Sequence, residues 1–168
     1  MEKKAIYVNR LRILSMVLCV LFLVLSAGCG KSYQKGAEHT LMFTAKCSNW
    51  GEVSLEEDFW ADTQWKVYYD GTVECFDEYN LSGATEPVTW ELSDADFETL
   101  YRLLDKKFLR YKKGTEACDG AAWSMQYYDA DGTEKHSFHG YIYGISALEE
   151  IEELIAKPEV VTEEAIAT

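Results

Sequence analysis

The chain has 168 residues, and its 29 Asp and Glu residues outnumber its 16 Lys and Arg residues, which gives a formal net charge of −13 at pH 7. An acidic surface repels nucleic-acid phosphates and anionic lipid headgroups. The charge therefore excludes nucleic-acid binding, and it excludes membrane binding through a basic surface patch.

The N-terminal region has the pattern of an export signal. Four basic residues lie within the first twelve positions, and they precede an apolar run at 13–25. This run is shorter than the roughly 20 residues that a membrane-spanning helix needs. A basic region followed by a short apolar region and small residues is typical of a secretory signal peptide. We therefore expect residues 1–28 to be a signal peptide.

The stretch LVLSAGCG at 23–30 resembles the lipobox of bacterial lipoproteins. In that family the cysteine receives a diacylglyceryl group on its sulfur, and the chain is cut immediately before it. The resemblance implies that Cys29 is lipidated and that Ala27 and Gly28 precede the cut. Acyl chains then hold the protein on the cell membrane, facing away from the cytoplasm. Ser26 stands where the family most often has Leu, which leaves secretion without an anchor as the alternative.

The rest of the chain has the length of one domain. Removing residues 1–28 takes away four basic residues and one acidic residue, so the formal charge falls from −13 to −16. The remaining 140 of the 168 residues suit a single domain. We expect a lipidated cysteine and tether at 29–40, one α+β domain at 41–157 and a disordered acidic tail at 158–168.

Strand patterns dominate the first half of this domain. Alternation of apolar and polar residues at 41–47 predicts a half-buried strand, and the acidic stretch at 49–63 is expected to be a loop. In WKVYYDGTVECF at 65–76, Asp70 and Gly71 separate two apolar and aromatic runs. This pattern predicts a β-hairpin with a type I′ turn, in which both central residues have positive φ.

A strand and a helix follow the first hairpin. Alternation at 88–92 predicts the strand, and Ser93 is the expected N-cap of the helix. The apolar stripe of this helix has helical spacing. It consists of Phe97, Leu100, Tyr101, Leu104 and Phe108.

The second half repeats this order of elements. A hairpin is expected around DADG at 129–132, with a type I turn closed by a glycine bulge. A short strand follows, and Ser146 with Glu149 has the spacing of a capping box at the start of a second helix. We therefore predict an α+β domain with a mainly antiparallel sheet of five or six strands and two amphipathic helices on one face. A duplicated hairpin-strand-helix unit is one interpretation of the order.

Four aromatic residues beside the hairpins are candidates for a ligand-facing patch. Aromatic rings beside a hairpin can offer flat apolar area to sugars or peptides. Cross-strand pairing within the sheet is the alternative role, and the sequence favours it. The four candidates are Trp65, Tyr69, Trp123 and Tyr128.

Three carboxylates around the second hairpin are candidates for a divalent-cation site. Asp129, Asp131 and Glu134 have part of the spacing of a calcium loop. The fifth position of that loop is Thr133 and the twelfth is Gly140, so the pattern is incomplete. A hairpin turn explains these residues better than a cation site does.

The cysteines and histidines show no metal-binding spacing. Cys47, Cys75 and Cys118 form no C-x-x-C pair, and a disulfide between two of them remains open. His136 and His139 are three residues apart, which on a strand places them on opposite faces. We expect one to be exposed and the other partly buried.

The sequence contains no recognisable catalytic motif, such as a nucleophile elbow or a phosphate-binding glycine loop. We therefore expect no catalytic residues and no cofactor. The favoured hypothesis is a lipid-anchored, non-catalytic module that binds a protein or a cell-wall glycan outside the cytoplasm. Its expected partners are the membrane, through the N-terminal lipid, and that protein or glycan, but not nucleic acid. A small cell-envelope hydrolase that uses acidic residues and a divalent-cation-binding domain are the alternatives.

Overall fold

A computed structural model describes three parts of the chain, residues 32–49, 56–111 and 121–156. All of these except Ser32 belong to one compact unit that begins at Tyr33. None of the helices in these three ranges is long and apolar enough to cross a membrane.

Several predicted features lie outside the described residues. They are the signal peptide with Cys29, the thiol of Cys118 and the tail at 158–168.

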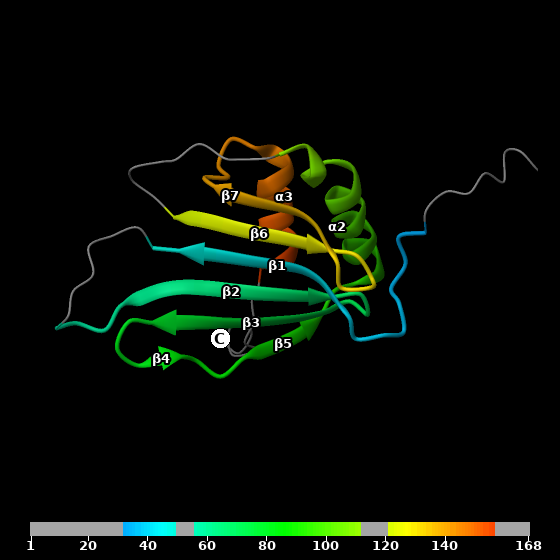
Figure 1. Cartoon of the computed structure of the whole chain (residues 1–168). Coiled ribbons are helices and arrows are strands. Elements are labelled where there is room, and N and C mark those ends of the chain that lie inside the picture. The colour runs from blue at the N-terminus through cyan, green and yellow to red at the C-terminus, as the bar shows by residue number, and fades with distance from the viewer. Residues whose placement is uncertain (1–31, 50–55, 112–120, 157–168) are drawn as a thin grey trace, which may run out of the picture. The chain divides into compact units, whose positions relative to one another are not determined.

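The described residues form an α+β fold with one mainly antiparallel sheet, which confirms the predicted class (Figure 1). Their strands are β1 (Leu41–Ser48), β2 (Trp60–Tyr68), β3 (Thr72–Tyr79), β4 (Gly83–Ala84), β5 (Val88–Glu91), β6 (Ala122–Tyr128) and β7 (Glu134–Gly140). Their helices are α2 (Asp94–Lys106), the short 3-10 helix η1 (Phe108–Arg110) and α3 (Ser146–Ile155).

The strands follow the order β4-β3-β2-β1-β6-β7, and β5 also pairs with β3. This sheet has seven strands, whereas the sequence predicted five or six. The difference is explained by β4, because a strand of two residues is too short to show alternation. The expected loop at 49–63 also ends early, since β2 already begins at Trp60.

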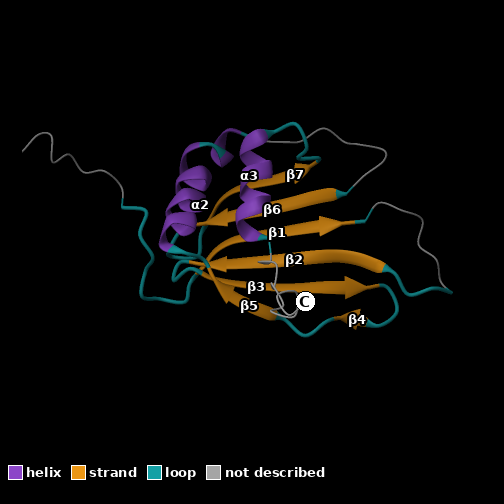
Figure 2. Cartoon of the chain, turned by 180° about the vertical axis from the view of Figure 1, so that it is seen from behind, coloured by secondary structure: helices purple, strands orange, loops and turns teal. Residues whose placement is uncertain are grey.

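The register of the strands defines two faces of the sheet. Residues directly opposite each other on paired strands share a face. Phe43 of β1 lies opposite Val67 of β2 and Tyr127 of β6, and all three are buried. We call their side of the sheet the core face and the other side the polar face. Figure 1 shows the strands in front of α2 and α3, and Figure 2, from behind, shows the helices in front of the strands.

The apolar stripes of both helices are buried together with residues of the core face in one cluster. On the helices this cluster contains Phe97, Leu100, Leu103, Leu104, Leu148, Ile151 and Ile155. Phe108 belongs to it as well, but it lies in η1 and not in α2. Of the predicted stripe, only Tyr101 is partly exposed.

The two helices begin differently. The Ser93 hydroxyl accepts a hydrogen bond from the backbone N–H of Asp96 at 3.1 Å, which confirms the predicted N-cap of α2. The predicted capping box of α3 is wrong, because Ile145 is the N-cap residue and Ser146 is already helical. The Glu149 carboxylate instead accepts a hydrogen bond from the backbone N–H of Gly144 at 2.9 Å.

Both hairpins form where they were expected, but the type I′ turn is wrong. No residue other than glycine in the described ranges has positive φ, so Asp70 does not have the φ that this turn needs. Gly71 has φ +90°, and its N–H donates to the carbonyl of Tyr68 at 2.9 Å. Gly132 has φ +83° and donates in the same way to Asp129. Each hairpin therefore has the turn predicted for the second one, closed by a glycine.

The interpretation of a duplicated unit holds only in part. After the first hairpin, β5 pairs with β3 as a third strand. After the second hairpin, Tyr141 makes only an isolated bridge before the chain enters α3. The second copy therefore lacks its third strand.

Candidate functional site

The predicted aromatic patch does not form as a surface. Trp65 and Trp123 stack on the core face, with ring centroids 5.5 Å apart and an angle of 14° between their planes. Trp123 is only 1% exposed. Tyr69 is also buried, and its hydroxyl donates to the carbonyl of Tyr128 at 2.8 Å. The role of packing within the sheet therefore applies to Trp65 and Trp123, whereas the buried ring of Tyr69 contacts Tyr101 of α2.

Tyr128 has a different environment. Its hydroxyl donates to the side-chain oxygen of Gln126 at 3.0 Å. Gln126 lies opposite Thr44 of β1. Thr44 stands between Phe43 and Ala45, which are both buried. Because side chains alternate along a strand, Gln126 and Tyr128 lie on the polar face.

The polar face carries side chains that bind one another across the strands. Thr44 donates to Gln126 at 3.3 Å, and Gln126 donates to Glu134 at 3.2 Å. On the other side of β1, the ammonium group of Lys66 lies 5.6 Å from the ring centre of Phe76. This face therefore mixes both signs of charge with aromatic area.

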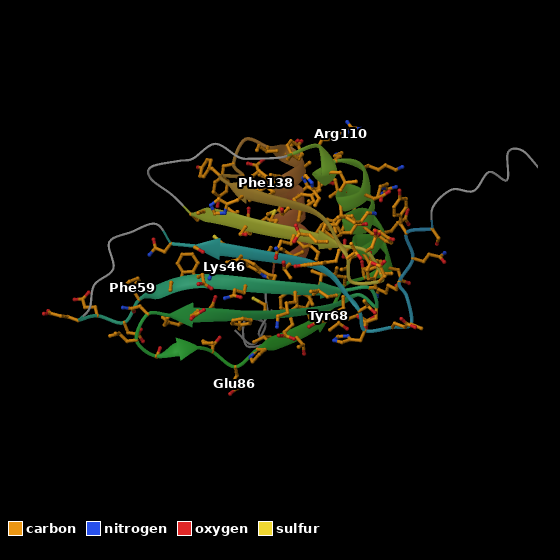
Figure 3. All side chains as sticks on the ribbon, in the orientation of Figure 1. Lys46, Phe59, Tyr68, Glu86, Arg110 and Phe138 are labelled. Carbon is orange, nitrogen blue, oxygen red and sulfur yellow. The ribbon has the colours of Figure 1, made fainter. Side chains whose placement is uncertain are left out.

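One group of five residues lies at the end of β2 on this surface. We call it the Tyr68 cluster, and it consists of His39, Lys66, Tyr68, Asp70 and Glu74. Lys66 donates to Glu74 at 2.8 Å, and the Tyr68 hydroxyl donates to the same carboxylate at 3.3 Å. The ring of His39 stacks on Tyr68, with centroids 3.8 Å apart, and its Nδ1 lies 2.8 Å from Asp70. Figure 3 labels Tyr68 at this end of β2 and Lys46 on β1.

Hydrogen bonds and burial determine the protonation states of Lys66, Glu74 and Tyr68 in this cluster. The hydrogen bond from Lys66 lowers the pKa of Glu74, and the same bond raises the pKa of Lys66. Burial raises the pKa of Tyr68, and the negative charge of Glu74 raises it further. At neutral pH the cluster therefore contains an ion pair beside a neutral phenol. Such groups hydrogen-bond and stack readily.

Sequence reasoning missed Tyr68 and chose its neighbour Tyr69. The signal that distinguishes them is the alternation along β2. Trp65, Val67 and Tyr69 fall on one side, and Val67 is an apolar residue that belongs in a core. Tyr68 falls on the other side together with Lys66, whose charge belongs in water.

A second ion pair lies near the start of β2. Asp62 lies on the polar face and is the buried charged residue of the described ranges, with its side chain 8% exposed. Lys46 lies 2.6 Å from it, and Gln64 donates to it at 2.9 Å. A buried carboxylate needs such partners, so these contacts explain its position without a ligand.

The three carboxylates considered for a cation are already engaged. Asp129 lies 3.1 Å from the ammonium group of Lys135. Asp131 accepts a hydrogen bond from the backbone N–H of Thr133 at 2.9 Å, and Glu134 accepts the bond from Gln126. Within the described ranges, no group of three or more His, Cys, Asp or Glu side chains is placed to hold a metal ion. The carboxylates stabilise the hairpin.

The thiols and imidazoles do not gather into a site in the described part of the chain. Cys47 is buried, and burial raises the pKa of its thiol to about 11. Cys75 is partly buried and forms no disulfide with Cys47. His136 is partly buried, with Nε2 against the carbonyl of Tyr111, and His139 is exposed, which agrees with the prediction for this pair.

No protein family matches this chain, and no curated protein sequence matches it.

Proposed function

We propose that this protein is a lipid-anchored bacterial lipoprotein that faces away from the cytoplasm. The lipobox-like stretch at 23–30 supports this proposal, because Cys29 follows small residues at the end of a short apolar run. The test is to replace Cys29 with Ala in a bacterial host and to measure acylation and membrane association. Loss of both agrees with the proposal. A variant that stays acylated and membrane-bound as before contradicts it.

We further propose that α2 and α3 both pack on the core face and that the polar face binds a protein partner without catalysis. The observation that carries this proposal is the Tyr68 cluster, where an aromatic pair is bordered by a lysine and two carboxylates. Tyrosine is enriched among the residues that dominate protein interfaces, and charges around it set specificity.

The shape of the surface favours a protein over a cell-wall glycan. The polar side chains stand on paired strands and bind one another, so they form a broad surface of mixed charge. Among the described residues, two cavities of about 470 and 290 Å³ are lined by residues 34–35, α2, β5 and α3. Small ligands prefer concave sites, and a protein partner is better suited to a broad strand surface.

The side chains of the polar face and of the second hairpin do not favour the alternatives. A cation-binding domain would use Asp129, Asp131 and Glu134, which are held by a lysine, a backbone N–H and a glutamine. A hydrolase would need a carboxylate whose pKa is adjusted for proton transfer beside a substrate cleft. On the polar face the pKa of Glu74 is lowered by an ion pair, which is the arrangement of a structural or binding group.

The proposed interface is tested by photo-crosslinking in living cells. A photoreactive amino acid is placed at Tyr68, and a matched variant carries it at Arg102, an exposed position on α2. We expect a discrete protein adduct from position 68 and none from position 102. Equal adducts from both positions contradict the interface. Retention on purified cell-wall fragments that is lost in Tyr68→Ala, without a protein adduct, identifies a glycan partner instead.

A further inference from the structure

The residues that precede β1 pack against the folded unit. We call residues 33–40 the N-terminal arm. Tyr33 makes an edge-to-face contact with Tyr101, with ring centroids 5.1 Å apart, and its hydroxyl donates to Asp105 at 3.0 Å. Further along, the N–H of Gly36 donates to the carbonyl of Tyr69 at 2.8 Å. The expected tether at 29–40 is therefore wrong for residues 33–40.

Lys35 is the strongest attachment of the arm. Its side chain is only 19% exposed. The ammonium group donates to Glu91 at 2.8 Å and to the carbonyl of Leu92 at 2.6 Å, and it lies 3.2 Å from Asp94. A charged group that loses most of its water and gains three acceptors is held firmly in place.

The Lys35 side chain also lies against the first hairpin. Gly71 approaches it so closely that a β-carbon on Gly71 would lie 2.6 Å from Cε of Lys35. At the other end of the arm, the N–H of Tyr69 donates to the carbonyl of Thr40 at 2.8 Å, and His39 binds Asp70. The arm is therefore fastened along its whole length.

We propose that the arm holds one end of the sheet close to the lipid surface, an inference that rests on the proposed lipidation of Cys29. Four chain steps separate Cys29 from Tyr33. A fully extended chain spans at most about 3.6 Å per residue, so these steps reach about 14 Å. A free tether through Thr40 would add seven steps and roughly 25 Å. Docking of the arm removes that extra reach.

The end of the sheet that faces the lipid follows from the contacts of the arm. Lys35 and His39 of the arm lie against the turn with Asp70 and Gly71, where β2 ends and β3 begins, and Tyr33 packs on α2. Since β2 has nine residues that rise about 3.4 Å each, its other end lies on the order of 27 Å away. Figure 1 shows the arm at one end of the strands and β4 at the other, and Figure 3 labels Phe59 at the far end of β2.

The charges at this end oppose insertion into the lipid. Asp94 and Glu98 are exposed beside the arm. Carboxylates are repelled by anionic headgroups within about one Debye length, roughly 8–10 Å at physiological salt. The anchored unit therefore stands with the end of the strands that carries the arm closer to the lipid than the end that carries β4.

Paramagnetic relaxation from the lipid surface tests this orientation. The mature acylated protein is placed in phosphatidylcholine nanodiscs with a gadolinium-chelating lipid, and relaxation enhancement is measured at backbone amides. We expect enhancement at Gln34, Gly36 and Thr72 to exceed that at Asn80 and Ser82 by more than about tenfold, because the strands separate the two groups by most of their length. Equal enhancement at both ends overturns the inference.

Two variants test the role of the arm. An insertion of twelve Gly and Ser residues between Ser32 and Tyr33 leaves every contact of the arm intact but lengthens the link by up to about 40 Å. We expect it to abolish the difference between the two ends. Lys35→Ala should reduce the difference, whereas Lys66→Ala, which removes an ion-paired lysine outside the arm, should not. An unchanged difference in the insertion variant overturns the inference.

The experiments distinguish a failure of the proposed role of the arm from a failure of the proposed lipid anchor. Loss of membrane association in Cys29→Ala supports the anchor, and a wild-type protein without acyl chains overturns it. An acylated, membrane-bound protein without a difference between the ends leaves the anchor standing and overturns the role of the arm.

Discussion

His39 of the N-terminal arm stacks on Tyr68 of β2, with ring centroids 3.8 Å apart and an angle of 17° between their planes. This pair joins the arm to the polar face. His39 also binds Asp70, which lies in the turn of the same hairpin. The proposed interface with a protein and the proposed orientation on the membrane therefore share one structural element.

We expect Trp123→Ala to destabilise the unit severely. The side chain is 1% exposed and stacks on Trp65, so its removal leaves a large cavity. The expected loss in the free energy of unfolding is about 3–5 kcal/mol. Urea denaturation of a soluble form that lacks residues 1–29 measures it. The matched change Trp90→Ala removes a ring that is only partly buried, so an equal loss in the two variants would count against a core role for Trp123.

We expect Gly71→Ala to destabilise more than Gly83→Ala. Both glycines have positive φ, at +90° and +78°, so both variants carry a similar backbone cost. A new β-carbon at 71 would also lie 2.6 Å from Cε of Lys35, whereas nothing lies within 4 Å at 83. The difference in unfolding free energy between the variants isolates this contact. It should shrink in the presence of Lys35→Ala, and a difference that does not change would show that Lys35 does not occupy this place.

We expect the Lys66–Glu74 pair to lose its stabilising effect in acid. The hydrogen bond from Lys66 lowers the pKa of Glu74 from the usual 4.5 in the folded state. The unfolded state therefore binds the proton more readily, so the stabilisation is present above pH 4.5 and is lost as the pH falls through the folded-state pKa. Glu74→Gln should be less stable than wild type at pH 7, and the gap should close toward pH 3. A gap that is constant between these pH values would contradict the pairing.

Glu152 on α3 should show the opposite dependence on pH. Burial raises its pKa above 4.5, and the charges of Glu149 and Glu153 raise it further. Its effect on stability is most favourable below pH 4.5 and is lost as the pH rises through the folded-state pKa. Glu152→Gln should therefore raise the melting temperature at pH 7. The exposed neighbour Glu153 provides the control, because Glu153→Gln relieves only part of the repulsion and should raise the melting temperature less.

Local sequence signals predicted the elements whose cause is local. The Ser93 N-cap, the apolar stripe of α2 and the two glycine-closed hairpins depend on residues within a few positions of one another. The prediction that α3 begins with a capping box failed because the Glu149 carboxylate reaches back to Gly144 instead of Ser146. The spacing of Ser146 and Glu149 does not show which of these two backbone N–H groups the Glu149 carboxylate binds.

Contacts between distant residues escaped prediction. Lys35 binds Glu91 and Asp94 across more than fifty positions of sequence, whereas its polar, glycine-containing segment has only the local pattern of a tether. Tyr68 and Tyr69 differ in a local feature. Both are aromatic, and only the alternation along β2, which places Tyr69 on the side of the buried Val67, distinguishes the polar face from the core face.

The affinity of the protein captured at position 68 tests the central claim most directly. Its dissociation constant is measured for wild type, for Tyr68→Ala and for Tyr143→Ala, which removes a tyrosine that is 49% exposed outside the polar face. An aromatic residue that dominates an interface contributes about 2 kcal/mol or more. We therefore predict binding at least about thirtyfold weaker for Tyr68→Ala, with Tyr143→Ala indistinguishable from wild type. Equal affinity in wild type and Tyr68→Ala, with both proteins folded, would contradict the proposal that the polar face is the binding surface.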